Sequence, residues 1–168
     1  MRPDGDTEHP AAADPGFEHA PVMVEEITAI FATVPPGTFV DATLGGGGHS
    51  AAVLESRDDL DLIGIDQDRD ALDAAIGRLA DFGDRVRTSQ RRFDDFDAAL
   101  ADHGVDVISG ALFDLGVSSP QLDRGDRGFS YRHEGPLDMR MDADQTWSAS
   151  DVVNGYSETE LASIIKRY

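Results

Sequence analysis

The stretch from Thr38 to Ser50, which reads TFVDATLGGGGHS, limits more than any other what this chain can fold into. It begins with apolar and β-branched residues typical of a buried strand, runs into the four glycines from Gly45 to Gly48, and leads into the helix-forming run AAVLE. A strand, a glycine turn and a helix start bring a bare backbone and a helix N-terminus up to a ligand. Glycine suits the turn because a Cβ would block both the tight bend and the ligand's approach. The stretch therefore predicts an α/β fold with a ligand site at this turn.

The spacing of the glycines indicates the kind of ligand. Gly45 and Gly47 fit the dinucleotide fingerprint G-x-G-x-x-G, but Ser50 stands at its third glycine. The acidic-x-G-x-G-x-G pattern of S-adenosylmethionine (SAM) methyltransferases fits better, with Asp41 as the acid and Thr43 in place of the first glycine. A carboxylate at Asp41 also suits a cationic, amine-bearing cofactor better than a pyrophosphate. The alternative is a flexible glycine-rich loop without a ligand.

Length and composition restrict the class of protein. At 168 residues the chain is long enough for one domain with a core. It has no apolar run of about 18 residues, and its first residues lack the apolar stretch of a secretory signal. Without cysteine it can form neither disulfides nor thiolate metal sites. These features predict a cytoplasmic protein with no membrane span.

The formal net charge of −19 argues against nucleic-acid binding, because an acidic surface repels phosphate backbones at long range. Lys166 is the only lysine. An acidic, salt-tolerant or high-GC source explains this charge more simply than a function does. Any basic surface for RNA must therefore be local or lie outside this chain.

The N-terminal region divides into a tail and the start of a domain. Residues 1–19 are rich in Pro, Ala, Asp and Gly, so we expect a disordered tail. Residues 20–117 indicate the N-terminal part of a doubly wound, Rossmann-like domain. The run PVMVEEITAIFATV predicts an amphipathic helix lying on the sheet, ended by PPG at residues 35–37. The apolar positions of this helix are Met23, Ile27, Ile30 and Phe31.

The run LDLIGID, residues 60–66, predicts a second strand that ends in an acid. Asp66 follows the glycines by about twenty residues, the spacing of an acid that binds ribose hydroxyls. The alternative is that Asp66 or Asp68 caps the following helix, RDALDAAIGRLADF, and the two roles can coexist. That helix carries Leu72, Ile76 and Leu79 on one face.

Two further strands complete the expected sheet. Residues 84–93 predict a third strand, with Phe93 at the edge where an adenine ring lies and can be stacked upon; the alternative is a core phenylalanine. Val105 to Leu115 predicts a fourth, central strand that delivers Asp114 to its C-terminal end. The carboxyl ends of parallel strands share one edge, so we expect Asp41, Asp66, Phe93 and Asp114 to converge on one crevice.

The segments DLGVSSPQLD, RGFSY and GPLDMRMD resemble the signature blocks of the RsmH/MraW family. These bacterial enzymes use SAM to methylate the N4 amine of a cytosine in 16S ribosomal RNA, in the small ribosomal subunit. The resemblance covers about residues 19–168 and implies a Rossmann-like SAM-dependent methyltransferase sheet of about four parallel strands. The cofactor contacts that it implies are Gly47, Gly48, His49, Asp66, Phe93, Asp114 and Gln121.

His49 and Gln121 rest on the resemblance alone. Without the resemblance, we would interpret His49 as a solvent-facing residue at a helix start and Gln121 as a polar loop residue. The remaining contacts also follow from the predicted strand ends and the glycine turn.

The family also differs from this chain in length. Family members are about twice as long and carry a helical domain inserted after the fourth strand. We therefore expect a fragment whose activity alone is in question, with residues 118–147 as a signature loop and 148–168 as the start of the insertion. Ser157 and Glu160 form a capping-box pattern for its helix. The apolar stripe of this helix, with little to pack against, is Leu161, Ile164 and Ile165.

The chemistry of amine methylation indicates a catalytic candidate. The lone pair of the cytosine amine is delocalised into the ring, so catalysis depends on in-line placement and on acceptors for the amine protons. Asp114 is the candidate acceptor, with Ser118 or Ser119 as helpers. No cluster has convincing metal spacing, since His133 and Glu134 are isolated, and we expect no structural metal.

The signature loop supplies candidates for contact with RNA. Phe129 and Tyr131 could stack on the target base or on a neighbouring base. The local basic patch consists of Arg124, Arg127, Arg132 and Arg140. In the alternative, the aromatic side chains pack the loop and the arginines pair with Asp123, Asp126, Asp138 and Asp142.

Two other functions compete with a methyltransferase. One is a nicotinamide-dependent oxidoreductase, which Ser50 and the lack of an evident hydride-transfer site disfavour. The other is a protein that only binds SAM and does not catalyse a reaction.

Overall fold

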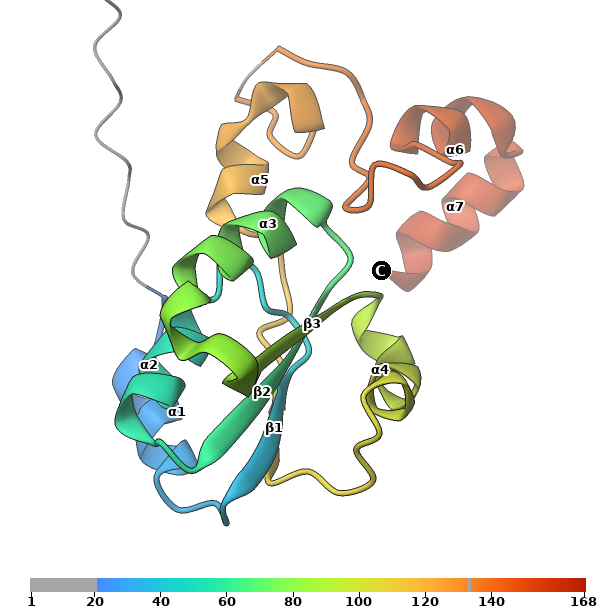
Figure 1. Cartoon of the computed structure of the whole chain (residues 1–168). Helices are drawn as coiled ribbons and strands as arrows, with labels where there is room; N and C mark the ends of the chain where they lie inside the picture. Colours follow the sequence, from blue (N-terminus) through green and yellow to red (C-terminus); the bar gives the residue numbers. More distant parts are fainter. Residues whose placement is uncertain (1–20, 133) are drawn as a thin grey trace, which may run out of the picture.

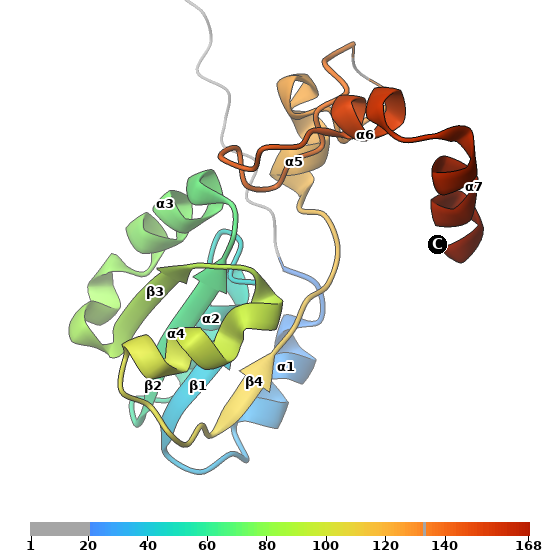
Figure 2. The ribbon, with the colours of Figure 1, turned by 90° about the vertical axis from the view of Figure 1, so that its right-hand side faces the viewer.

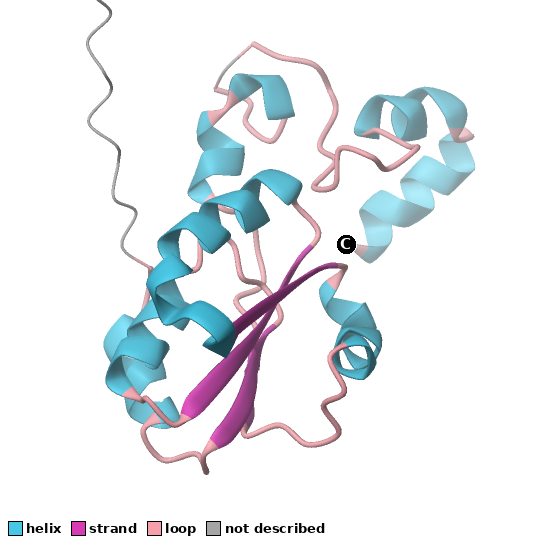
Figure 3. Ribbon diagram, in the orientation of Figure 1, coloured by secondary structure: helices cyan, strands magenta, loops and turns pink. Residues whose placement is uncertain are grey.

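The computed structural model describes residues 21–132 and 134–168, so the tail predicted for residues 1–19 lies outside the described residues. Its centre is a sheet of four parallel strands in the order β3-β2-β1-β4 (Figure 2). Figure 1 labels β1, β2 and β3 from another side, and Figure 3 shows the same view coloured by secondary structure. The strands are β1 (Gly37–Asp41), β2 (Leu60–Asp66), β3 (Val86–Gln90) and β4 (Gly110–Leu112). The predicted α/β, Rossmann-like arrangement is therefore confirmed.

Helices cover both faces of the sheet. The first three, α1 (Val24–Phe31), α2 (Gly48–Ser56) and α3 (Arg69–Arg78), lie on one face, and α4 (Phe96–Asp102) lies on the other (Figure 2). The short 3-10 helices are η1 (Ala80–Arg85), η2 (Phe93–Asp95) and η3 (Gly125–Arg127). The last helices are α5 (Ser119–Asp123), α6 (Ala149–Gly155) and α7 (Glu158–Arg167). No helix in the described part of the chain has the length and apolar character that a membrane crossing needs.

The two central strands are apolar on both faces, as expected for a parallel sheet between two layers of helices. Phe39 of β1 pairs with Leu62 of β2, and both are fully buried on the face covered by α1, α2 and α3. Val40 pairs with Ile63, and both are fully buried on the face covered by α4. The core therefore fixes the register that delivers the carboxyl ends of both strands to one edge.

The fourth strand is shorter than predicted. The apolar run Val105 to Leu115 contains only three strand residues, which pair with β1 and form one edge of the described sheet. Val107 is 83% exposed, whereas Val105 packs against the cluster beneath α4. Only Gly110 to Leu112 pair with β1 as a strand, and apolarity alone does not reveal that limit.

In two helices the buried face is narrower than the spacing of apolar residues in the sequence predicts. In α1, Ile27 and Phe31 pack on the core, but Met23 and Ile30 are 64% and 63% exposed. In α3, Leu72 and the adjoining Leu79 are buried, whereas Ile76 is half exposed. Each helix contacts the sheet along one narrow line, so side chains at the margin of the stripe stay in solvent.

The C-terminal helices lie away from the sheet (Figure 2). The capping box predicted at Ser157 and Glu160 is present and starts α7, and a second one at Ser148 and Asp151 starts α6. Ile165 on α7 is 78% exposed, which agrees with the expectation that this stripe packs little. The boundaries assigned to the signature loop and to the helical insertion stay predictions.

Candidate functional site

The glycine turn joins β1 to α2 at the carboxyl edge of the sheet. Gly47 is the N-cap of α2 with φ 74°, a left-handed conformation that favours glycine. Its N–H donates to the carbonyl of Leu44 at 2.8 Å, and a Cβ added there would meet Leu79 and Ala75 at 3.2–3.3 Å. Gly47 therefore allows the turn to bend and to pack on α3.

The first residue of α2, Gly48, is small for a different reason. A Cβ on Gly48 would collide with the ring of Pro21. The expectation that a ligand needs this space is therefore replaced by a contact within the protein. A Cβ on Gly46, in contrast, would have no atom within 4 Å, so the turn is open at that position.

Asp41 is enclosed under the turn, with only 1% of its surface exposed. Its carboxylate accepts from the Ser50 hydroxyl at 2.7 Å and from the Thr43 N–H at 3.2 Å. Burial raises the pKa of Asp41 to about 6, although the bonds from Ser50 and Thr43 oppose this shift. The expectation that Asp41 meets a cofactor amine is therefore wrong. Ser50, which departs from the dinucleotide fingerprint, is its buried partner.

Asp66 ties the end of β2 to the glycine turn. Its Oδ2 accepts from the Gly45 N–H at 2.8 Å, and its Oδ1 accepts from the Asp68 N–H at 2.9 Å. Burial raises the pKa of this half-buried carboxyl, against the lowering effect of these bonds. Each oxygen keeps one lone pair for another donor, which suits a pair of ribose hydroxyls. The cap of α3 is Asp68, which accepts from the Asp70 N–H at 3.1 Å.

Asp114 lies beside the same turn, two residues beyond β4. Its backbone N–H donates to the Thr43 hydroxyl at 2.7 Å, and its side chain is 53% exposed. The Nδ1 atom of His49 lies 4.0 Å from its Oδ2. His49 is buried, with Nε2 at 2.7 Å from the carbonyl of Val22, so it is not the solvent-facing residue of the alternative. A carbonyl only accepts, so Nε2 donates to it, and Nδ1 faces Asp114.

Phe93 lies just past β3 and is 39% exposed. Its ring meets Phe113 edge to face at 6.4 Å, and Phe113 meets Phe96 in the same way at 6.3 Å. Phe113 directly precedes Asp114, so this aromatic row adjoins the candidate acceptor. The partly exposed ring of Phe93 suits stacking by a nucleobase.

Gln121 is buried within α5 rather than placed on a polar loop. Its Nε2 donates to Oδ2 of Asp68 at 3.1 Å, and its Oε1 accepts from the Ser118 N–H at 3.0 Å. The role of Asp68 as partner of a residue 53 positions away was missed from the sequence. Its only local signal is that of a helix cap.

Three of the four arginines in the signature loop form ion pairs. Arg127 pairs with Asp68 at 2.8 Å, Arg124 with Asp70 at 2.9 Å and with Asp126 at 3.1 Å, and Arg140 with Asp138 at 2.8 Å. These pairs favour the alternative in which the arginines serve the loop itself, although Asp123 and Asp142 are not the partners. Within the described residues, Arg132 has no acidic side chain within 4.0 Å.

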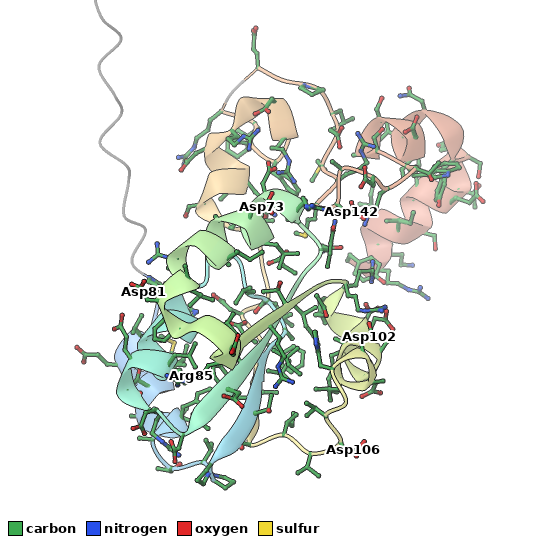
Figure 4. All side chains as sticks on the ribbon, in the orientation of Figure 1. Asp73, Asp81, Arg85, Asp102, Asp106 and Asp142 are labelled. Atoms are coloured by element: carbon green, nitrogen blue, oxygen red, sulfur yellow. The ribbon has the colours of Figure 1, made fainter. Side chains whose placement is uncertain are left out.

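Acidic side chains elsewhere are scattered over the molecule. Figure 4 labels Asp73, Asp81, Asp102 and Asp106, which come from different elements on different sides. Acidic side chains are therefore not confined to the site. No group of three or more acidic or histidine side chains in residues 21–132 and 134–168 could hold a metal ion.

The structure brings the expected site residues to one edge of the sheet. Gly47, Gly48, His49, Asp66 and Asp114 belong to the turn or touch it. Phe93 joins them through Phe113, and Gln121 joins them through Asp68. The donor set fits SAM: carboxylate lone pairs for hydroxyls, an aromatic face for adenine, and an exposed carboxylate at Asp114. A parallel sheet with this turn after β1 and an acid at the end of β2 defines the class of Rossmann-like, nucleotide-binding α/β domains.

Comparison with known proteins narrows this class. Residues 16–168 match the MraW methylase family. A protein of Geotalea uraniireducens named ribosomal RNA small subunit methyltransferase H is 50% identical over 153 residues, which is 90% of this chain and 49% of that relative. A protein of the same name from Symbiobacterium thermophilum is 48% identical over 154 residues, 90% of this chain and 48% of the relative. The chain belongs to the MraW methylase family, and it spans about half the length of the curated relatives it matches.

A solved rRNA methylase from Streptococcus thermophilus is a more distant match. It is 23% identical, with a TM-score of 0.44, over 55% of this chain and 53% of that one. This likeness adds nothing to the family assignment.

Proposed function

We propose that this chain is the cofactor-binding part of a SAM-dependent methyltransferase that methylates the N4 amine of a cytosine in 16S rRNA of the small ribosomal subunit. The observation that carries the proposal is the family match over residues 16–168, together with 50% identity to a ribosomal RNA small subunit methyltransferase H. Residues 20–117 would form the SAM-binding domain, residues 118–147 the signature loop, and residues 148–168 the start of a helical insertion.

Each residue that would hold SAM suits a different chemical group of the cofactor. Asp66 would accept from the ribose hydroxyls, because each of its oxygens has one lone pair left after its bond to the backbone. Phe93 would stack on the adenine ring. Gly48 and His49 begin α2, where the first N–H groups have no partner within the helix. Gly47 forms the turn that directs these N–H groups toward the ligand site.

SAM supplies an activated methyl group when bound. In the transfer, a bond forms between the methyl carbon and the cytosine amine nitrogen, the bond from that carbon to sulfur breaks, and the nitrogen releases one proton. We assign Asp114 as the acceptor of that proton, because its carboxylate is exposed and lies beside the glycine turn. An acceptor at this position helps the nitrogen to free its lone pair for bonding.

The RNA-facing surface would include Phe129, Tyr131 and Arg132. Tyr131 is 94% exposed, and a cavity of about 380 Å³ beside it is also lined by Phe129, Pro136 and Leu137. Exposed aromatic rings stack on unpaired bases. Among the four loop arginines, Arg132 is the one without an acidic partner in the described residues, so it is the candidate for a phosphate contact.

Calorimetry with SAM and with NAD tests the cofactor assignment. We expect saturable binding of SAM and none of NAD; the reverse would favour an oxidoreductase. Asp66→Asn should weaken SAM binding about 10-fold to 100-fold, since bonds to a charged acceptor are lost. Asp61→Asn is the matched control, because Asp61 lies on the same strand with its side chain in solvent. Equal affinity of both variants would remove Asp66 from the site.

A methylation assay on small ribosomal subunits tests the activity. A second candidate function is SAM binding without catalysis, which this assay distinguishes from methyl transfer. The assay compares this chain with a full-length relative, and with the same relative carrying the substitution that corresponds to Asp114→Asn. Loss of turnover with retained SAM affinity would support Asp114 as the proton acceptor. Unchanged turnover and affinity would contradict that role.

A further inference from the structure

The two carboxylate oxygens of Asp68 have separate functions. Asp68 is 5% exposed and stands at the start of α3. Its Oδ1 accepts from the Asp70 N–H at 3.1 Å and so caps the helix. Its Oδ2 accepts from Nε2 of Gln121 at 3.1 Å and from Nη2 of Arg127 at 2.8 Å. One oxygen therefore belongs to the helix and the other to the signature loop.

Asp68 also adjoins the acid assigned to ribose. The Asp68 N–H donates to Oδ1 of Asp66 at 2.9 Å. The residue thus connects the end of β2 on its backbone side with Gln121 on its side-chain side. A displacement of Asp68 would therefore change the positions of both Asp66 and Gln121.

Gln121 retains capacity for a ligand. A glutamine amide has two N–H donors and an oxygen with two lone pairs. Asp68 takes one N–H, and Ser118 occupies one lone pair of the oxygen. One N–H and one lone pair are left. Their direction is set by the bond to Asp68, because the amide is planar.

Arg127 reinforces the same contact. Its side chain is 14% exposed, and its Nη2 donates also to the carbonyls of Arg140 and Met141 at 3.2 and 3.0 Å. Burial raises the pKa of Asp68, but the bonds from Arg127 and Gln121 outweigh it and hold that pKa below its usual value. Asp68 is therefore ionised at neutral pH and anchors Gln121 and Arg127 onto α3.

We propose that Asp68 is a positioning residue of the cofactor site, which holds Gln121 toward SAM through Oδ2 and fastens the signature loop to α3. This role rests on the proposed function, in which Gln121 contacts the cofactor. Asp68 itself touches no substrate or cofactor.

Asp68→Asn isolates the proposed role. The asparagine keeps an oxygen to cap α3, whereas its NH₂ group faces the N–H groups of Gln121 and Arg127. Asp73→Asn is the matched control, since Asp73 also lies on α3 and is 65% exposed, and its partner Arg69 is 74% exposed. Exposed ion pairs of this kind contribute little to stability, because solvent and salt screen them.

The experiment measures SAM affinity by calorimetry and amide hydrogen exchange by mass spectrometry on the full chain. In Asp68→Asn we expect SAM affinity to fall about 10-fold or more and exchange to accelerate in residues 121–128, with α3 unchanged. Asp73→Asn should bind SAM within about twofold of the unsubstituted chain. A purely capping role for Asp68 would change exchange in α3 instead, and that result would overturn the proposal.

A double-mutant cycle tests whether Asp68 acts through Gln121. In a Gln121→Ala background, Asp68→Asn should reduce SAM affinity by no more than about twofold, because the side chain that it positions is gone. The same 10-fold loss in that background would overturn the proposal, as would wild-type affinity of Asp68→Asn alone.

Two further measurements separate other causes of failure. If Asp68→Asn does not fold, the double variant Asp68→Asn with Arg127→Gln removes the unpaired guanidinium. This double variant must still bind SAM more weakly than the unsubstituted chain. If the unsubstituted chain binds no SAM, the proposed function fails. The exchange of residues 121–128 in Asp68→Asn, compared with Asp73→Asn, then still decides whether Asp68 anchors the loop.

Discussion

The glycine turn and the signature loop meet at one edge of the sheet, but they are held there in different ways. The turn is supported from beneath by two carboxylates, Asp41 and Asp66, which bond to residues close to the turn and to strand ends that are buried in the core. The signature loop is held on α3 by side chains far apart in sequence, chiefly Asp68 with Gln121 and Arg127. The turn is therefore part of the folding core, whereas the loop depends on a few polar contacts.

The largest expected effect contrasts the core with the last helix. Leu62→Ala removes a fully buried side chain from β2 and should lower the free energy of unfolding by about 3 kcal/mol. Ile165→Ala on α7 is the matched truncation at a position that is 78% exposed, and it should change stability by less than about 0.5 kcal/mol. Urea unfolding measures both. Similar losses in the two variants would mean that α7 is part of the same cooperative unit.

The second prediction concerns pH and the support beneath the turn. The pKa of Asp41 is raised from 3.8 to about 6 in the folded protein, so the folded state binds this proton more tightly than the unfolded chain. Its contribution to the free energy of unfolding therefore falls as pH rises through this window, by up to about 3 kcal/mol. The raised pKa of Asp66 acts in the same direction, and the lowered pKa of Asp68 acts in the opposite one.

Asp41→Asn provides the control for this pH dependence. The variant should gain stability relative to the unsubstituted chain as pH rises from about 4 to about 7, because asparagine carries no charge to desolvate. Denaturant curves at several pH values measure the difference. A difference that stays constant with pH would show that Asp41 titrates normally in the folded state.

The third prediction compares two neighbouring glycines of the turn. Gly47→Ala places a Cβ at a φ of 74° and close to Leu79, and should cost about 1–2 kcal/mol of stability. Gly46→Ala meets no atom within 4 Å and should leave stability nearly unchanged. If Gly46→Ala nevertheless weakens SAM binding, the open side of the turn is the side that the ligand approaches. Equal stability loss in both variants would contradict this geometry.

The sequence alone predicted the turn region well and the loop region poorly. The bounds of β2 and the position of Asp66 follow from local apolarity and spacing, which the core then enforces. The burial of His49 and the Asp68 contacts depend on residues distant in sequence, for which no local pattern exists. The length of β4 depends on where β1 offers a partner, and apolarity carries no such information.

The smallest effect concerns the cap of α7. Ser157→Ala removes the hydroxyl that accepts from the Glu160 N–H and should destabilise that helix by about 1 kcal/mol. Because α7 lies apart from the sheet, amide exchange should accelerate in residues 158–167 only. Faster exchange in β1 or β2 as well would show that the last helix supports the core.

The gathering of distant side chains around one cofactor is tested most directly by backbone NMR of this chain during titration with SAM. We expect the amide signals of Gly47, Asp66, Phe93, Asp114 and Gln121 to shift together with a single dissociation constant. Shifts confined to one of these segments, or no saturable change at any of them, would contradict a shared site at the edge of the sheet.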